Sequence, residues 1–135
     1  MTWHRNERGT VTVMSIGFLI LLGLLTVLVV NASAAFLQRQ ELNNLADGAA
    51  LAAADGLDDT AFYERRQVVL NGDVASELVS RFIAGSGARV TELSVRSDHV
   101  RIRLERPMDL PLVPPGWVDR TVVVASANAW LRQGL

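Results

Sequence analysis

The longest feature of the hydrophobic pattern is an uncharged apolar run from Val11 to Val30, VTVMSIGFLILLGLLTVLVV. Of its 20 residues, 14 are Leu, Ile, Val or Phe. A helix rises about 1.5 Å per residue, so a run of this length crosses about 30 Å, the thickness of the hydrocarbon core of a bilayer. The pattern therefore predicts a membrane-spanning helix.

The helical period continues beyond this span. Apolar and small residues recur at three- and four-residue steps, while polar residues fall mostly on the other side. No proline interrupts residues 10–54, and the helical period continues through them, which predicts one continuous rod, half in lipid and half projecting from it. Gly56, followed by Asp58 and Asp59, predicts the end of this rod and the cap of the next helix.

Two shorter helices are expected next. The first covers Thr60 to Leu70 and ends at the turn Asn71-Gly72. The second starts with Asp73 as its cap, and Gly85-Ser86-Gly87 closes it.

The remaining pattern alternates and predicts strands. Thr91, Leu93 and Val95 are expected on one face of the first strand, and Val100, Ile102 and Leu104 on one face of the second. Polar residues around Ser97-Asp98 favour an antiparallel hairpin between them. A third strand is expected within Thr121–Leu131, after a proline-broken loop.

The predicted fold class is α+β. A long N-terminal helix, with a transmembrane half and a projecting half, precedes a small head of about two helices and a three-stranded antiparallel sheet. We expect a tail at residues 1–10, the long helix at 11–57 and the head at 58–135.

Charge sets the expected orientation. Arg5 and Arg8 precede the span, whereas Arg39 is the one basic residue that follows it closely, which favours a cytoplasmic N-terminus and an extracytoplasmic head in the plasma membrane. The formal net charge of −1 gives no case for nucleic-acid binding. The chain has no Cys, which excludes disulfides, thiolate metal sites and a Cys nucleophile.

No catalytic constellation is evident. His4 and His99 are predicted on opposite sides of the bilayer, so they cannot share a metal or acid–base site. Adjacent acids such as Asp58-Asp59 are more often helix caps than catalytic pairs. The Arg101 and Arg103 row is a solvated strand face or a partner-binding one. We expect no enzyme activity, cofactor, metal or small-molecule substrate.

A cleavable signal peptide is the main alternative. Ala32-Ser33-Ala34 offers a cleavage site just past the apolar run, after a short basic segment. The run is longer than the usual apolar core of such a peptide, about 7 to 15 residues. The chain would then be a secreted binding module released at Ala34.

Two regions are candidates for partner contact. The small-residue half of the rod would let another helix approach closely, with Asp47 as either a contact or a solvated residue. The loop Pro107–Trp117 exposes apolar residues and either packs over the sheet or meets a partner or the bilayer surface. The helix–helix candidates are Leu42, Leu45, Asp47, Ala49 and Ala52, and the loop candidates are Leu110, Leu112 and Trp117.

The N-terminal half resembles a known family. The segment ERGTVTVMSIGFLILLG, followed by LQRQELNNLADGAALAAADGL, is similar to the N-terminal region of TadG-like and TadE-like pilus-assembly proteins of tight-adherence (Tad/Flp) systems. Arg8-Gly9 fits the Arg-Gly pair that precedes the family's span. The second element is matched by Arg39, Leu42, Asn43, Leu45, Ala46, Asp47, Ala49, Ala50, Leu51, Ala52 and Ala53.

The chain also departs from the pilin side of this family. Tad pilins and TadE-like pseudopilins are cut after a Gly and carry Glu at the fifth mature position, which here, counted from Gly9, is Met14. The resemblance therefore favours the TadG-like side, where the segment is an uncleaved anchor. It implies a non-catalytic membrane component of a pilus or secretion apparatus, whose partners are the bilayer and other Tad-type membrane proteins.

Overall fold

The computed structural model describes residues 7–64, 72–113, 116 and 121–131, with only the backbone described for residues 7–8 and 58–64. Two helices, α1 (Glu7–Glu64) and α2 (Gly72–Phe82), precede three strands, β1 (Arg89–Val95), β2 (His99–Met108) and β3 (Thr121–Trp130). The strands form one antiparallel sheet in the order β1-β2-β3. The predicted α+β fold is confirmed.

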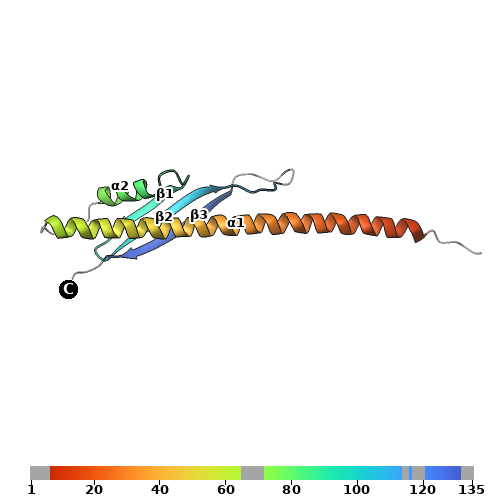
Figure 1. Cartoon of the computed structure of the whole chain (residues 1–135), viewed down its shortest axis with the longest axis horizontal. Helices are drawn as coiled ribbons and strands as arrows, with labels where there is room; N and C mark the ends of the chain where they lie inside the picture. Colours follow the sequence, from red (N-terminus) through yellow and green to blue (C-terminus); the bar gives the residue numbers. More distant parts are fainter. Residues whose placement is uncertain (1–6, 65–71, 114–115, 117–120, 132–135) are drawn as a thin grey trace, which may run out of the picture.

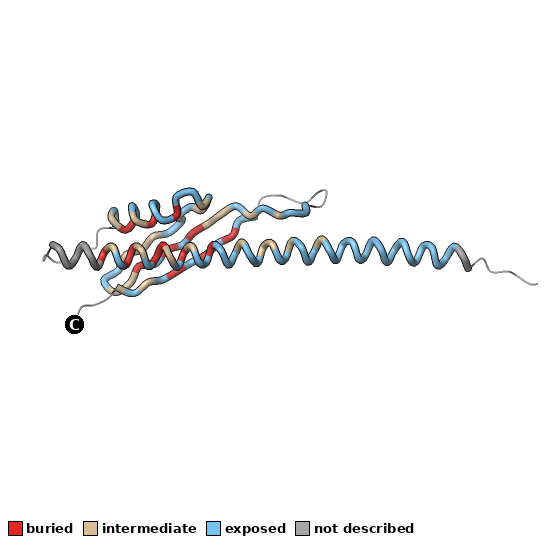
Figure 2. The backbone as a smooth tube through the Cα atoms, viewed as in Figure 1, coloured by how far each residue is buried: buried red, intermediate tan, exposed pale blue. Residues whose placement is uncertain are grey.

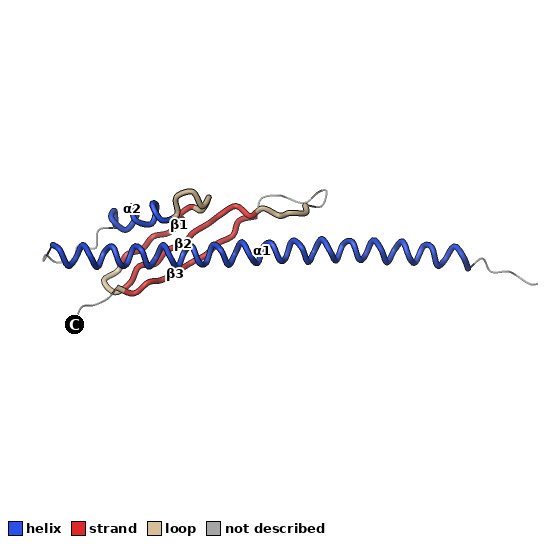
Figure 3. Tube along the Cα trace, in the orientation of Figure 1, coloured by secondary structure: helices blue, strands red, loops and turns tan. Residues whose placement is uncertain are grey.

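Helix α1 organises the whole molecule (Figure 1). It has 58 residues, so at 1.5 Å per residue it is about 87 Å long. The strands lie slantwise along one half of it, α2 lies beside the same half, and no other described helix or strand packs on the half that extends away (Figures 1 and 3). Both helices therefore cover one face of the sheet, and the second face of the sheet is open.

The bare half of α1 is the apolar one. Within Gly9–Leu57 the helix is long and apolar enough to cross a membrane. In its most apolar stretch of 18 residues, none of the described residues is buried. Figure 2 shows the same division, with exposed residues along the bare half and buried residues where the sheet begins.

The core of the head is built on a small-residue face of α1. Its buried residues on this helix follow a regular helical spacing: Leu42, Ala46, Ala49, Ala50, Ala53, Ala54 and Leu57. Against them lie Ala75 and Val79 of α2 and Val100, Ile102, Leu104, Val123, Ala125 and Ala127 of the sheet. The head's core thus includes a part of the long helix that the sequence analysis assigned to the projecting rod.

Small side chains let α2 approach α1 closely. A Cβ placed on Gly48 would lie 2.7 Å from Cζ of Phe82, and a Cβ on Gly56 would meet Cδ1 of Leu78. Glycine at these two positions makes room for the side chains of the second helix.

The expected helix end at Gly56 is wrong. Helix α1 runs through Gly56, Asp58 and Asp59 without interruption to Glu64. The glycine serves the contact with Leu78 instead of a turn. The separate helix expected over Thr60–Leu70 is therefore wrong in its first part, which belongs to α1, and residues 65–70 lie outside the described residues.

The second predicted helix and the hairpin are present. Helix α2 has Asp73 in its first turn, and the chain turns after it through Ser86, whose Oγ donates to the Ile83 carbonyl at 2.6 Å. Gly85 and Gly87 adopt φ of 80° and 73°, the left-handed region that favours glycine. The Arg96 N–H donates to the His99 carbonyl at 2.9 Å and closes the β1–β2 hairpin around Ser97-Asp98.

One face assignment in β1 is wrong. The register shifts between Val90 and Glu92, so Thr91 is an extra residue in this strand. Val90 pairs with Leu104 and packs against the core, whereas Thr91 is exposed. Simple alternation fails here because a bulge moves the residues before it to the opposite face.

We predict that Ala53→Leu destabilises the head. Ala53 is fully buried, and an added isobutyl group has no space between α1 and the rest of the core, so the free energy of unfolding should fall by about 1–3 kcal/mol. Urea unfolding of the full chain in micelles, followed by Trp fluorescence, measures this. The matched control Asn43→Leu places the same side chain on the exposed face and should change stability by no more than about 0.5 kcal/mol.

Candidate interaction site

The small-residue candidates on α1 face the chain's own head. Leu42 and Ala49 are fully buried in its core, and Leu45 packs against that core. Ala52 is half-buried. Helix α2 approaches α1 closely at Gly48 and Gly56, whereas a contact of the five candidate residues with another helix stays a prediction.

Asp47 lies on the other side of α1. It is exposed, together with Asn44, Leu51 and Asp55, which are one or two helical turns away. Leu51 is 57% exposed on this face. We call these four residues the outer ridge; a contact between Asp47 and another helix stays a prediction, and it would use this ridge.

The loop after β2 is fastened to α1 by two side-chain amides. Gln38 donates from Nε2 to the Asp109 carbonyl at 2.6 Å and accepts the Asp109 N–H on Oε1 at 3.2 Å. Asn31 holds Leu112 in the same way, with Nδ2 donating to its carbonyl at 2.5 Å and Oδ1 accepting its N–H at 3.1 Å. The two amides are seven residues apart, two helical turns, so they lie on the same side of α1.

An ion pair supports the first of these two connections. Arg106 donates from Nη2 to Glu41 Oε2 at 2.8 Å and to the Gln38 carbonyl at 3.3 Å. Its side chain is only 16% exposed, so the charge lies between sheet and helix with its partner beside it. The end of β2 is thus fixed to α1 through a charged group, immediately before the loop starts.

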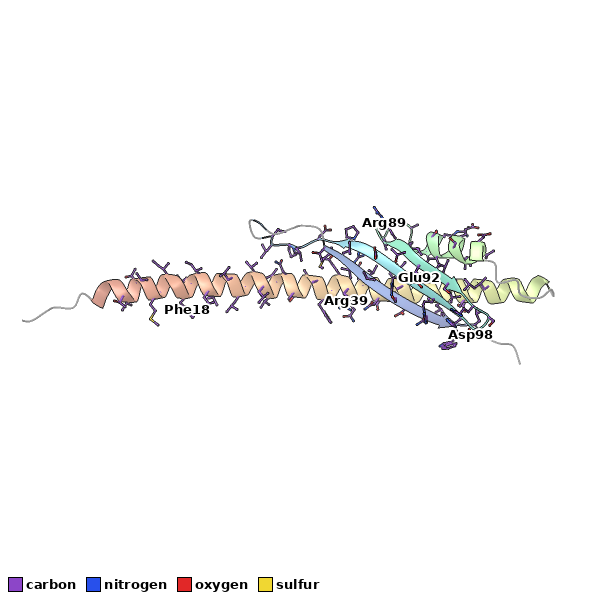
Figure 4. The ribbon with its side chains drawn as sticks, turned by 180° about the vertical axis from the view of Figure 1, so that it is seen from behind. Phe18, Arg39, Arg89, Glu92 and Asp98 are labelled. Carbon is purple, nitrogen blue, oxygen red and sulfur yellow. The ribbon has the colours of Figure 1, made fainter. Side chains whose placement is uncertain are left out.

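A groove of about 450 Å³ opens between α1 and the start of β3. Its apolar lining includes Phe36 at 66% exposure and Val122 at 56% exposure. Arg39 supplies the charged side chain of the lining, and Figure 4 shows it on α1 close to the sheet. The complete lining is Ala35, Phe36, Arg39, Met108, Val122, Val123 and Val124.

The loop candidates occupy the same end of the head. Leu110 is half-buried, and Leu112 is 41% exposed despite the hydrogen bonds of its backbone. Trp117 lies outside the described residues. The loop packs along α1 with its backbone, while apolar side chains remain accessible.

The open face of the sheet is polar in its centre. Arg101 donates from Nε to Asn128 Oδ1 at 2.9 Å, and Arg103 Nη1 lies 3.8 Å from Glu92 Oε2. These pairs join neighbouring strands across a solvated face. Whether a partner binds this arginine row stays a prediction.

The histidines form no joint site within the described part of the chain. His99 Nδ1 is 2.7 Å from Asp98 Oδ1, and the His99 ring lies 5.4 Å from that of Trp130, whereas His4 is outside the described residues. Among the side chains that the structure describes, those of residues 9–57, 72–113, 116 and 121–131, no group of three or more His, Asp or Glu gathers as metal ligands do.

Asn31, Gln38 and Arg106 were not singled out from the sequence. The signal available was weak: two amides placed two turns apart at the polar end of an apolar span, and an arginine that interrupts the alternation of β2. Leu51 could have been found because Leu37, Asn44 and Leu51 repeat at seven residues, a spacing typical of a helix-contact seam.

Comparison with known proteins agrees with the resemblance. Residues 9–56 match the family model for Flp pilus-assembly TadE/G-like proteins. The match covers less than half of the 135 residues and lies wholly within α1. No curated protein and no solved structure matches the chain.

We predict that the two amides independently hold the loop. Asn31→Ala removes two hydrogen bonds from Leu112, so local opening should become easier by about 1 kcal/mol, which is about a fivefold faster exchange of the Leu112 amide hydrogen. Gln38→Ala should have the same effect on Asp109. Residue-resolved exchange by NMR in micelles measures both.

The matched control for these variants is Asn43→Ala, which removes an exposed amide from a different face of α1. Exchange at Asp109 and Leu112 should then be unchanged. Equal exchange in all three variants and the unaltered chain would contradict the fastening of the loop.

Proposed function

We propose that the chain is a single-pass, non-catalytic component of a Tad/Flp-type pilus assembly or secretion apparatus, either minor pilin-like or anchoring. The apolar half of α1 crosses the plasma membrane with the N-terminus in the cytoplasm, and the head lies outside. The proposed tail is residues 1–10 and the proposed head is residues 58–135, to whose core α1 contributes before it ends at Glu64.

One observation carries this proposal. The segment that matches the TadE/G-like model is part of a single uninterrupted helix, which is bare and apolar at one end and forms the head's core at the other. A head built on the anchoring helix itself cannot rotate or swing on a linker. Such a rod suits a subunit that presents a surface to neighbours in the same membrane.

The continuous helix also bears on the secreted alternative. Ala34 lies within α1, between Asn31 and Gln38, the two residues that hold the loop. Cleavage after Ala34 would remove Asn31 and its hydrogen bonds to Leu112. An uncleaved chain is therefore the form that keeps every described contact of the loop.

We expect the orientation to be measurable with single cysteines, because the chain has none of its own. A membrane-impermeant maleimide should label Ser97→Cys in intact cells, since Ser97 is exposed at the far hairpin. Thr2→Cys should be labelled only after permeabilisation. The reverse pattern would contradict the proposed topology, and a mature protein that starts at Ala35 would contradict the anchor.

We expect the outer ridge to contact other membrane subunits. A photocrosslinking residue at Leu51 should give adducts that contain other Tad-type pilus-assembly components, identified by mass spectrometry. Asp47→Ala should reduce these adducts without altering the unfolding of the head, because Asp47 is exposed. Arg81, exposed on α2, is the matched crosslinking position for comparison. Adducts of equal yield at both positions would contradict a specific ridge.

A further inference from the structure

The uncharged part of α1 is longer than a hydrocarbon core requires. Between Arg8 and Arg39 there are 30 residues without a charge, residues 9–38. At 1.5 Å per residue they extend about 45 Å, which equals the thickness of a bilayer including both headgroup layers. If Val11–Val30 crosses the hydrocarbon, residues 31–38 extend about 12 Å from its edge, through the headgroup layer to its outer limit and just beyond.

The head is attached to this same segment. Asn31 binds Leu112 and Gln38 binds Asp109, at the two ends of residues 31–38. The loop that carries Leu112 must therefore lie at the depth of the headgroups, alongside the helix. Figure 1 shows this end of the head directed along α1 toward its bare half.

Exposed apolar side chains lie on α1, on the loop and at the start of β3 near this level. Phe36 and Leu37 are 66% and 65% exposed on the helix, and Leu112 and Val113 are 41% and 42% exposed on the loop. Val122 joins them across the groove at 56% exposure. We call Phe36, Leu37, Leu112, Val113 and Val122 the apolar collar.

The charged residues near the apolar collar lie on its side away from the apolar run. Arg39 is the first charged residue of α1 after the span and lines the groove beside Phe36. Asp109 is level with Gln38, since its backbone is bonded to that side chain. Apolar residues toward the hydrocarbon with charges above them are the distribution expected at a membrane interface.

We propose that the apolar collar is inserted in the headgroup layer of the leaflet from which the head emerges. This rests on the proposed function, because it requires that α1 spans the bilayer. The collar continues the lipid-facing surface of the helix onto the loop and the start of β3. The head then sits directly on the membrane in a fixed orientation, with Asp98 and the hairpin at the end of the sheet that lies away from it (Figure 4).

Labels at three depths test the proposal on the full chain in phospholipid nanodiscs. An environment-sensitive fluorophore is attached to a single cysteine at Phe18, Val113 or Ser97. Three quenchers are compared: a lipid with a nitroxide on its acyl chain, a lipid with a nitroxide on its headgroup, and iodide in the water. We expect acyl-chain quenching at Phe18, headgroup quenching at Val113 and iodide quenching at Ser97. The Phe18 label reports the span alone.

The outcomes separate this inference from the proposed function. Lipid quenching at Phe18 with only iodide quenching at Val113 would overturn the inserted collar and leave the anchor intact. Protection of Val113 from both kinds of quencher would also overturn it, because protein would then cover the collar. Absence of lipid quenching at Phe18 would contradict the spanning helix itself.

A charged variant provides the matched comparison. Val113→Asp should abolish headgroup quenching of a label at Val122, because a buried carboxylate would lift this end of the head from the lipid. Leu51→Asp places the same charge on the outer ridge, above the membrane, and should leave the Val122 signal unchanged. Unchanged quenching in both variants would overturn the proposal, provided that amide exchange shows Asp109 and Leu112 still bound.

Discussion

The structure depends on the close packing of a small-residue face of α1 against the sheet and α2. Alanines at positions such as Ala46, Ala50 and Ala53 are fully buried or nearly so, and two glycines admit side chains of the second helix. Because the helix contributes so little side-chain volume, Ile102, Leu104 and Val79 can reach its surface and fill the core. The Ala-rich run is thus a surface shaped for the chain's own head.

This packing joins anchor and head into one body. A head connected by a flexible linker would lose its orientation relative to the membrane, whereas here the helix that leaves the apolar segment is itself a core element. The connection continues along α1 toward the apolar run, through the Arg106–Glu41 ion pair and the side-chain amides of Gln38 and Asn31. The position of the head relative to the apolar half of α1 is therefore set by these contacts.

The sequence was more informative about elements than about sites. Its periodicities predicted the long helix, α2 and a three-stranded antiparallel sheet, because each element buries one face and so carries a repeating pattern. The surfaces were harder: Leu42 and Ala49 have the spacing of a helix contact, and spacing alone does not tell whether the contacting element belongs to the same chain. The loop attachment joins Gln38 to Asp109 and Asn31 to Leu112. These pairs are separated by 71 and 81 positions in the sequence, and local patterns do not encode such distant contacts.

By itself the sequence determined the apolar length of α1, its TadE/G-like segment and the α+β class, since hydrophobicity, composition and period are properties of consecutive residues. The tertiary structure decided that α1 continues through Gly56, that Thr91 forms a bulge, and that the small-residue face turns inward while Asp47 turns outward. Each of these depends on what lies opposite: Leu78 beside Gly56, two residues of β2 opposite the three residues Val90–Glu92 of β1, or a sheet that covers one side of a helix.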